Sequence, residues 1–192
     1  MKKDIHFAGI SGSLRKDSYN TRLLKNVVNL LPSDVSMEIL SFEDLPLYNA
    51  DYDLPASQER PAVVAAFRNK LAEADALVIV SPEYNYSIPG GLKNAIDWAS
   101  RGEDSPLLKK PVSVMGATTG LWGTVRMQLA FHSLFQFLNM QPVYKPEVLL
   151  AGAKEKFDTA GNLKDEQTKD IIRKNLENLR HVVLHNLTLH TT

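Results

Sequence analysis

The stretch ALVIVSPEYNYSIPGGLKNAIDW, residues 76–98, contains the pattern from which the fold is predicted. Its first five residues, ALVIV, form a continuous apolar run rather than an alternating one. A strand that is apolar at every position is covered on both faces, as in a parallel sheet. After a loop rich in proline and glycine, Leu92, Ile96 and Trp98 mark a helical segment. The stretch therefore predicts a buried strand, a loop and a helix that packs back on the sheet.

The same succession of strand and helix recurs along the chain. Strand patterns occur at residues 5–10, 35–40, 76–80, 111–115 and, more weakly, near 143–150. Helical patterns occur up to Pro32, from Pro61 onward, after residue 91, over 124–138 and over 165–187. Residues 42–60 are predicted to be a long irregular loop. The order predicts an α/β fold, a doubly wound five-stranded parallel sheet in a three-layer α/β/α sandwich, as one domain of residues 1–192.

The composition narrows the classes of function. Lys plus Arg and Asp plus Glu each total 22, so the net charge of zero gives no electrostatic reason to expect a nucleic acid or membrane partner. The chain has no cysteine, which excludes disulfides, thiolate metal sites and dithiol redox chemistry. Electron transfer by this chain would therefore require a bound cofactor.

Neither a targeting signal nor a metal site is predicted. The first apolar run is too short for a signal peptide, and no run approaches the roughly 18–20 residues that span a bilayer, so we expect a cytoplasmic protein. His181 and His185 have a spacing that suits a metal ion, but no third ligand is near them in sequence. We interpret the two histidines as polar surface.

Three of the predicted strands run into loops rich in Gly, Ser, Thr and Asn. These strands end near residues 10, 80 and 116. The carboxyl ends of parallel strands lie at one edge of the sheet, where ligands bind in such folds. The sequence therefore predicts a ligand site built from these three loops.

The first loop, GISGSLRKDSYN at residues 9–20, suits a terminal phosphate. Its glycines allow close approach of the backbone, its serines and Asn20 offer donors, and Arg15 adds a cation with a planar set of donors. It lacks the Gly-Lys-Ser/Thr ending that binds triphosphates with magnesium, which favours a monophosphate. The alternative is an ordinary strand–helix turn in which Ser18 only caps the helix.

The second and third loops suit a flat ring. In SPEYNYSIPGG, residues 81–91, two prolines stiffen the loop, while Tyr84 and Tyr86 supply aromatic faces. GATTGLWG, residues 116–123, offers backbone N–H groups to the polar edge of such a ring. The alternative for the second loop is a solvent-exposed loop in which Pro89 begins the next helix. The alternative for the third loop is a flexible connection between a strand and a helix.

Two of these motifs resemble those of a known family. GSLRKDSYN at 12–20 and SPEYNYSIPGGLKNAIDW at 81–98 are similar to motifs of the NADPH-dependent FMN reductases, especially the bacterial branch of NAD(P)H quinone, chromate and azo reductases. The resemblance implies a flavodoxin-like fold, bound FMN, NADPH or NADH as co-substrate, and a homodimer or homotetramer. It also implies hydride transfer through FMN to quinones, azo dyes, chromate or free flavin, with no catalytic acid or base of the protein's own.

The resemblance also implies a set of FMN-binding residues. The phosphate end would meet Ser11, Ser13, Leu14, Arg15, Ser18 and Asn20. The ring would meet Pro82, Glu83, Tyr84, Asn85 and Tyr86, with Gly116, Ala117 and Thr118 nearby. We assign the donors for the reduced ring to the backbone of residues 116–119 and expect the carboxylate of Glu83 to turn away and hold its loop.

Two other functions are weighed against the reductase. One is a non-enzymatic FMN electron carrier of the flavodoxin type, and such carriers tend to be acidic, whereas this chain is neutral. The other is a flavin-free signalling or scaffold domain. The joint presence of Ser13, Arg15, Ser18 and Asn20 argues against that second alternative.

Overall fold

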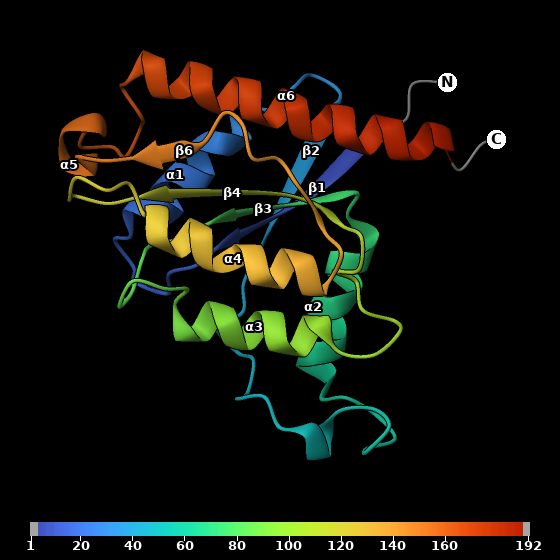
Figure 1. Ribbon diagram of the computed structural model, residues 1–192. Coiled ribbons are helices and arrows are strands. Elements are labelled where there is room, and N and C mark those ends of the chain that lie inside the picture. Colours follow the sequence, from blue (N-terminus) through green and yellow to red (C-terminus); the bar gives the residue numbers. More distant parts are fainter. Residues whose placement is uncertain (1–3, 190–192) are drawn as a thin grey trace.

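The computed structural model describes residues 4–189 and contains a parallel sheet between two layers of helices (Figure 1). The strands are β1 (Ile5–Ser11), β2 (Val35–Leu40), β3 (Ala76–Val80), β4 (Pro111–Ala117), β5 (Gln141–Pro142) and β6 (Val148–Leu150). Their order is β2-β1-β3-β4-β5, with β6 also pairing with β4. This order confirms the predicted doubly wound sheet and is the flavodoxin-like arrangement.

The helices follow the strands as predicted, except that the short α5 was not predicted. They are α1 (Tyr19–Val28), α2 (Ala62–Glu73), α3 (Gly90–Ser100), α4 (Val125–Phe137), the short α5 (Ala153–Lys156) and α6 (Glu166–Leu189). Helices α1 and α6 cover one face of the sheet, and α2, α3 and α4 cover the other (Figure 1). No helix within residues 4–189 is long and apolar enough to cross a lipid bilayer.

Strand β3 shows why the apolar run at residues 76–80 is continuous. Every residue of β3 is buried. Leu77 and Ile79 pack into the core beneath α2, α3 and α4, whereas Val78 and Val80 pack into the core beneath α1 and α6. Successive side chains of a strand point to opposite faces, so a central strand between two helical layers needs an apolar residue at each position.

The fifth position of the sheet is the part of the fold that differs from the prediction. Instead of one strand near 143–150, the short β5 pairs with the start of β4, and β6 pairs with its end. Pro142 is the last residue of β5, and Pro146 lies in the gap between β5 and β6. Proline lacks the N–H that a strand donates to its neighbour, which explains why the ladder is interrupted here.

The segment 42–60 is irregular apart from one short 3-10 turn, η1 (Ala50–Tyr52). Its first part is attached to α3, because Trp98 Nε1 donates to the Pro46 carbonyl at 2.8 Å and Tyr48 N donates to Asn94 Oδ1 at 2.7 Å. Trp98 is completely buried, which confirms its predicted role in packing. The segment containing η1 extends beyond α3 (Figure 1).

Candidate functional site

The three predicted loops meet at one edge of the sheet. The Gly12 N–H donates to the Val80 carbonyl at 2.9 Å, and the Ser81 N–H donates to the Met115 carbonyl at 2.9 Å. The backbone at Gly12 lies so close to the second loop that a Cβ there would be 2.2 Å from Ser81 Oγ. Only glycine fits here without a shift of its neighbour, so close packing explains the glycine of the GSLRKDSYN motif.

A second link joins the first loop to the third. Asn20 Nδ2 donates to the Ala117 carbonyl at 2.9 Å, and Asn20 Oδ1 accepts from the Ala117 N–H at 2.8 Å. Asn20 is 3% exposed, and Ala117 is equally buried. The side-chain amide of Asn20 therefore acts as a strand partner for the end of β4.

A hollow lies between the first loop and the segment that follows β2. One wall consists of Ser11, Ser13, Leu14, Arg15, Lys16 and Thr21, and the other consists of Ile39, Leu40, Ser41, Phe42 and Glu43. Ser11 Oγ and Thr21 Oγ1 are 2.7 Å apart and share a hydrogen bond. Arg15 is exposed, and its Nη2 donates to the Asp17 carbonyl at 2.6 Å. Hydroxyls and two cations line this hollow, and Glu43 is its one acidic member.

The six residues predicted for the phosphate end divide into two groups. Ser11, Ser13, Leu14 and Arg15 line the hollow. Ser18 and Asn20 do not line it, since Ser18 is buried and its Oγ accepts from the N–H groups of Asn20 and Thr21, capping α1. The capping role foreseen for Ser18 is confirmed, whereas a phosphate contact for either residue stays a prediction.

The second loop contains a tight and unusual turn. Tyr84 N donates to the Ser87 carbonyl at 3.1 Å, and Ser87 N donates to the Tyr84 carbonyl at 2.9 Å. The two central residues have left-handed backbones, with φ of 50° at Asn85 and 63° at Tyr86. Asparagine tolerates this conformation, but it is uncommon for tyrosine, and such outliers cluster at functional sites.

Glu83 holds this loop to the start of α4. Its Oε2 accepts from the backbone N–H of Arg126 at 2.9 Å and of Met127 at 3.2 Å. A carboxylate at a helix N-terminus satisfies unpaired donors and complements the helix dipole. The expectation that the Glu83 carboxylate turns away and anchors the loop agrees with this geometry.

The side chain of Arg126 lies between two aromatic rings of the second and third loops. Its Cζ is 4.3 Å from the ring centroid of Tyr86 and 5.2 Å from that of Trp122. Its Nη1 is 3.5 Å from Glu83 Oε1. The guanidinium is therefore stacked as a cation on aromatic faces and paired weakly with a carboxylate.

The backbone assignment for the third loop is wrong for two residues. The Ala117 N–H donates to Asn20, and the Thr118 N–H donates to the Leu150 carbonyl at 2.9 Å. These amides are consumed within the protein, because β4 runs on as a paired strand through Ala117 and beside β6. Of the segment 116–119, Thr119 lies beyond the strand and is exposed.

Several residues at this edge were not predicted from the sequence. Lys16 and Thr21 line the hollow, Arg126 lies against Tyr86 of the turn, and Trp122 lies against Arg126. Thr21 comes directly after the predicted loop, so its position alone would have suggested it. Only the tertiary fold brings Arg126 close to Glu83 and Tyr86, and no local sequence pattern predicts this contact. Within residues 4–189, no cluster of three or more His, Asp or Glu side chains could hold a metal ion.

The sequence is similar to those of known proteins. The model of the family described as NADPH-dependent FMN reductase matches residues 5–155. The chain is 42% identical over 181 residues to an NAD(P)H-dependent FMN reductase of Pseudomonas aeruginosa, covering 94% of this chain and 96% of that protein. It is 38% identical over 172 residues to a quinone reductase of Escherichia coli, covering 88% and 90%.

The fold also matches that of a solved protein structure. The flavoenzyme NAD(P)H:(acceptor) oxidoreductase of Paracoccus denitrificans superposes with a TM-score of 0.84 at 29% identity, covering 94% of this chain and 98% of that one. The match of the family model spans all three loops and all the strands from β1 to β6. The chain therefore belongs to the NADPH-dependent FMN reductase family.

Proposed function

We propose that this protein is an FMN-dependent NAD(P)H oxidoreductase that reduces quinones and similar electrophilic acceptors. The relatives named as FMN reductase and quinone reductase support this activity. The observation that carries the proposal is the juxtaposition, at one edge of the sheet, of the hydroxyl-lined hollow and the tyrosine turn. One suits the phosphate end of FMN, and the other suits its ring.

The hollow fits a monophosphate. The hydroxyls of Ser11, Ser13 and Thr21 face the same space as two cations, Arg15 and Lys16. Hydroxyl donors and guanidinium groups are suitable partners for phosphate oxygens. The N–H groups at the start of α1 are already capped by Ser18, so the side chains and the loop backbone would carry the contact.

The second loop fits a flat ring. Pro82 and the turn at Asn85 and Tyr86 form a bed that Glu83 fixes to α4. When bound, FMN supplies the two-electron chemistry that links NAD(P)H to the acceptor. The chain's own residues bind and orient the reactants, and the Glu83 carboxylate, being occupied by α4, is not available as a general base.

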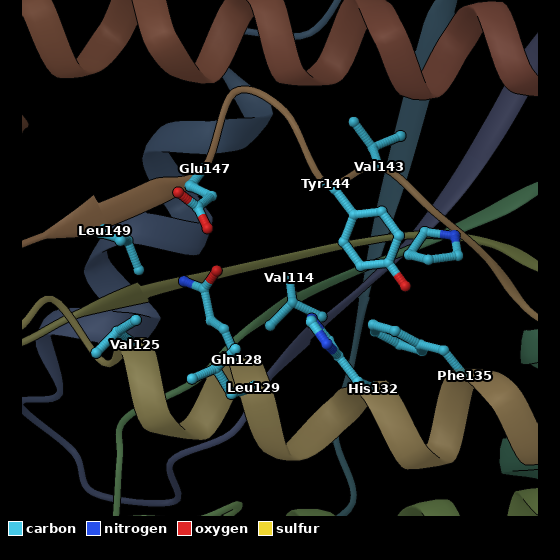
Figure 2. A pocket seen from close by; sticks show the side chains of 11 residues that line it. Val114, Val125, Gln128, Leu129, His132, Phe135, Val143, Tyr144, Glu147 and Leu149 are labelled. Carbon is cyan, nitrogen blue, oxygen red and sulfur yellow. The ribbon is translucent and has the colours of Figure 1, made fainter.

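The oligomeric part of the proposal rests on one surface. A shallow hollow lies between α4 and residues 142–149 (Figure 2). Figure 2 shows Leu129, His132 and Phe135 of α4 on one side and Tyr144 and Glu147 on the other. Leu129 and Tyr144 are both more than half exposed. With a net charge of zero, an apolar surface of this kind favours self-association, so we expect a homodimer or homotetramer.

The proposal is tested by binding and turnover. The purified protein is titrated with FMN, and the FMN-loaded protein is then screened with NADPH and NADH against quinones, azo dyes, chromate and free FMN. We expect saturable FMN binding and turnover with quinones. A protein that stays colourless after incubation with FMN and dialysis would contradict the proposal.

A further inference from the structure

The tyrosine turn contains a conformation that its own sequence does not favour. At Tyr86, φ is 63°, a value that L-residues with a Cβ adopt at an energetic cost. The ring of Tyr86 does not offset that cost by burial, because Tyr86 is 71% exposed. Two backbone hydrogen bonds between Tyr84 and Ser87 close the turn, and a contact made by the exposed Tyr86 ring would stabilise it further.

Arg126 supplies that contact. Its guanidinium lies 4.3 Å from the Tyr86 ring centroid. The backbone of Arg126 is held by the Glu83 carboxylate at 2.9 Å, and its side chain is covered on another side by Trp122. Arg126 therefore connects two elements: its backbone belongs to α4 and is bound by Glu83, and its guanidinium lies against the Tyr86 ring of the turn.

We propose that Arg126 is a positioning residue that holds the Tyr84–Ser87 turn in its ring-binding shape. This inference rests on the proposed function. The two hydrogen bonds of the turn use the N–H groups of Tyr84 and Ser87. The N–H groups of Asn85 and Tyr86 donate to no other residue within 4–189, and both of these residues are exposed. Left-handed backbones at both positions fix the direction in which these two amides project, which suits donors to a ligand ring.

The planar group of arginine matters to this role. Guanidinium stacks flat on an aromatic face, whereas the ammonium of lysine is a strongly hydrated point charge. A cation–π contact at an exposed site is enough to shift an equilibrium between two turn conformations by several fold.

A double-mutant cycle with FMN binding tests the inference. Asparagine tolerates the left-handed conformation, so Tyr86→Asn removes the need for an external hold. We expect Arg126→Met to weaken FMN binding about twofold to fivefold with Tyr86 present, and to have no measurable effect in the Tyr86→Asn background. Arg173→Met, which changes an exposed arginine of α6, is the matched control and should leave the dissociation constant unchanged.

Equal losses in the two backgrounds would overturn the inference, because Arg126 would then act on FMN directly. Amide hydrogen exchange of the FMN-free protein gives an independent readout. Arg126→Met should speed exchange at Asn85–Ser87, and unchanged exchange there would also overturn the inference.

Should Arg126→Met not fold, Arg126→Lys replaces it, since lysine keeps the charge near Glu83 but not the planar stack on the Tyr86 ring. Absence of FMN binding in the unmodified protein would reject the proposed function, while the exchange measurement would still decide the role of Arg126.

Discussion

Asn20 and Ala117 are joined by a reciprocal pair of hydrogen bonds, in which the side-chain amide of one pairs with the backbone of the other at 2.9 and 2.8 Å. The pair connects the start of α1 to the end of β4, and both residues are buried. The first and third loops are therefore joined directly at this edge of the sheet. Because the pair consumes the Ala117 amide, it also explains why that amide does not face a ligand.

The first prediction concerns this pair. Asn20→Ala removes two hydrogen bonds and leaves the buried Ala117 N–H and carbonyl unsatisfied. We expect a loss of about 2–4 kcal/mol in the free energy of unfolding, measured by urea denaturation. Asn29→Ala, at the exposed end of α1, is the control and should cost much less. Equal stability of Asn20→Ala and the unmodified protein would show that the pair contributes nothing.

The close approach of the first and second loops gives a second prediction. Gly12→Ala would place a Cβ 2.2 Å from Ser81 Oγ and 3.0 Å from a methyl group of Leu92. We expect a destabilisation of about 1–3 kcal/mol, of which Ser81→Gly should restore a part. Gly90→Ala serves as the control, because a Cβ at Gly90 meets nothing within 4 Å. Additive effects of the Gly12 and Ser81 substitutions would refute the contact.

Asp165, just before α6, gives a prediction about pH. The pKa of Asp165 is lowered, first by the hydrogen bond from the Thr168 hydroxyl and then by Lys156, whose Nζ is 3.0 Å away. A lowered pKa in the folded state means that the ionised form stabilises the fold above the ordinary pKa of an aspartate, about 4, and that this contribution is lost as the pH falls through the lowered value.

We therefore expect Asp165→Asn to cost about 0.5–1 kcal/mol at neutral pH, a size that allows for the partial exposure of the carboxylate. The difference from the unmodified protein should shrink below a pH of about 4. Thermal unfolding at a series of pH values measures it. A difference that is constant down to strongly acidic pH would contradict the lowered pKa.

Arg15 provides the most direct test of the proposal that the hollow beside the first loop binds the FMN phosphate. Arg15→Ala should weaken FMN binding by about 1.5–3 kcal/mol, the size of a hydrogen bond to a charged group. The control is Lys25→Ala, which removes an exposed cation from the last turn of α1. Calorimetric titration with FMN measures both. An unchanged dissociation constant for Arg15→Ala would show that Arg15 does not meet the phosphate.

The sequence predicted the sheet because burial on two faces requires a recognisable pattern. β3 is apolar at all five positions and fully buried, whereas the edge strand β2 alternates apolar and polar residues and is only partly covered. The split of the fifth strand escaped prediction because Pro142 and Pro146 interrupt pairing inside a pattern that is otherwise apolar. The pattern of hydrophobic side chains predicts which residues are buried. Pairing between strands depends instead on the backbone N–H groups, which proline lacks.

The candidate site was predicted less completely, for a related reason. Loop composition showed which donors are present but not which of them the protein uses internally, as with Asn20, Ser18 and the Thr118 amide. The position of Arg126 depends on how α4 packs beside the second loop. Contacts between elements far apart in sequence leave no local signal to read.

The central claim is tested most directly by following the two half-reactions separately under anaerobic conditions. FMN-loaded protein is mixed with NADPH or NADH in a stopped-flow instrument, and the reduced protein is then mixed with a quinone. We predict rapid bleaching of the flavin absorbance in the first step and its rapid full recovery, by two electrons, in the second. Bound FMN that neither nucleotide reduces on the timescale of turnover would contradict the reductase and favour an electron carrier of the flavodoxin type.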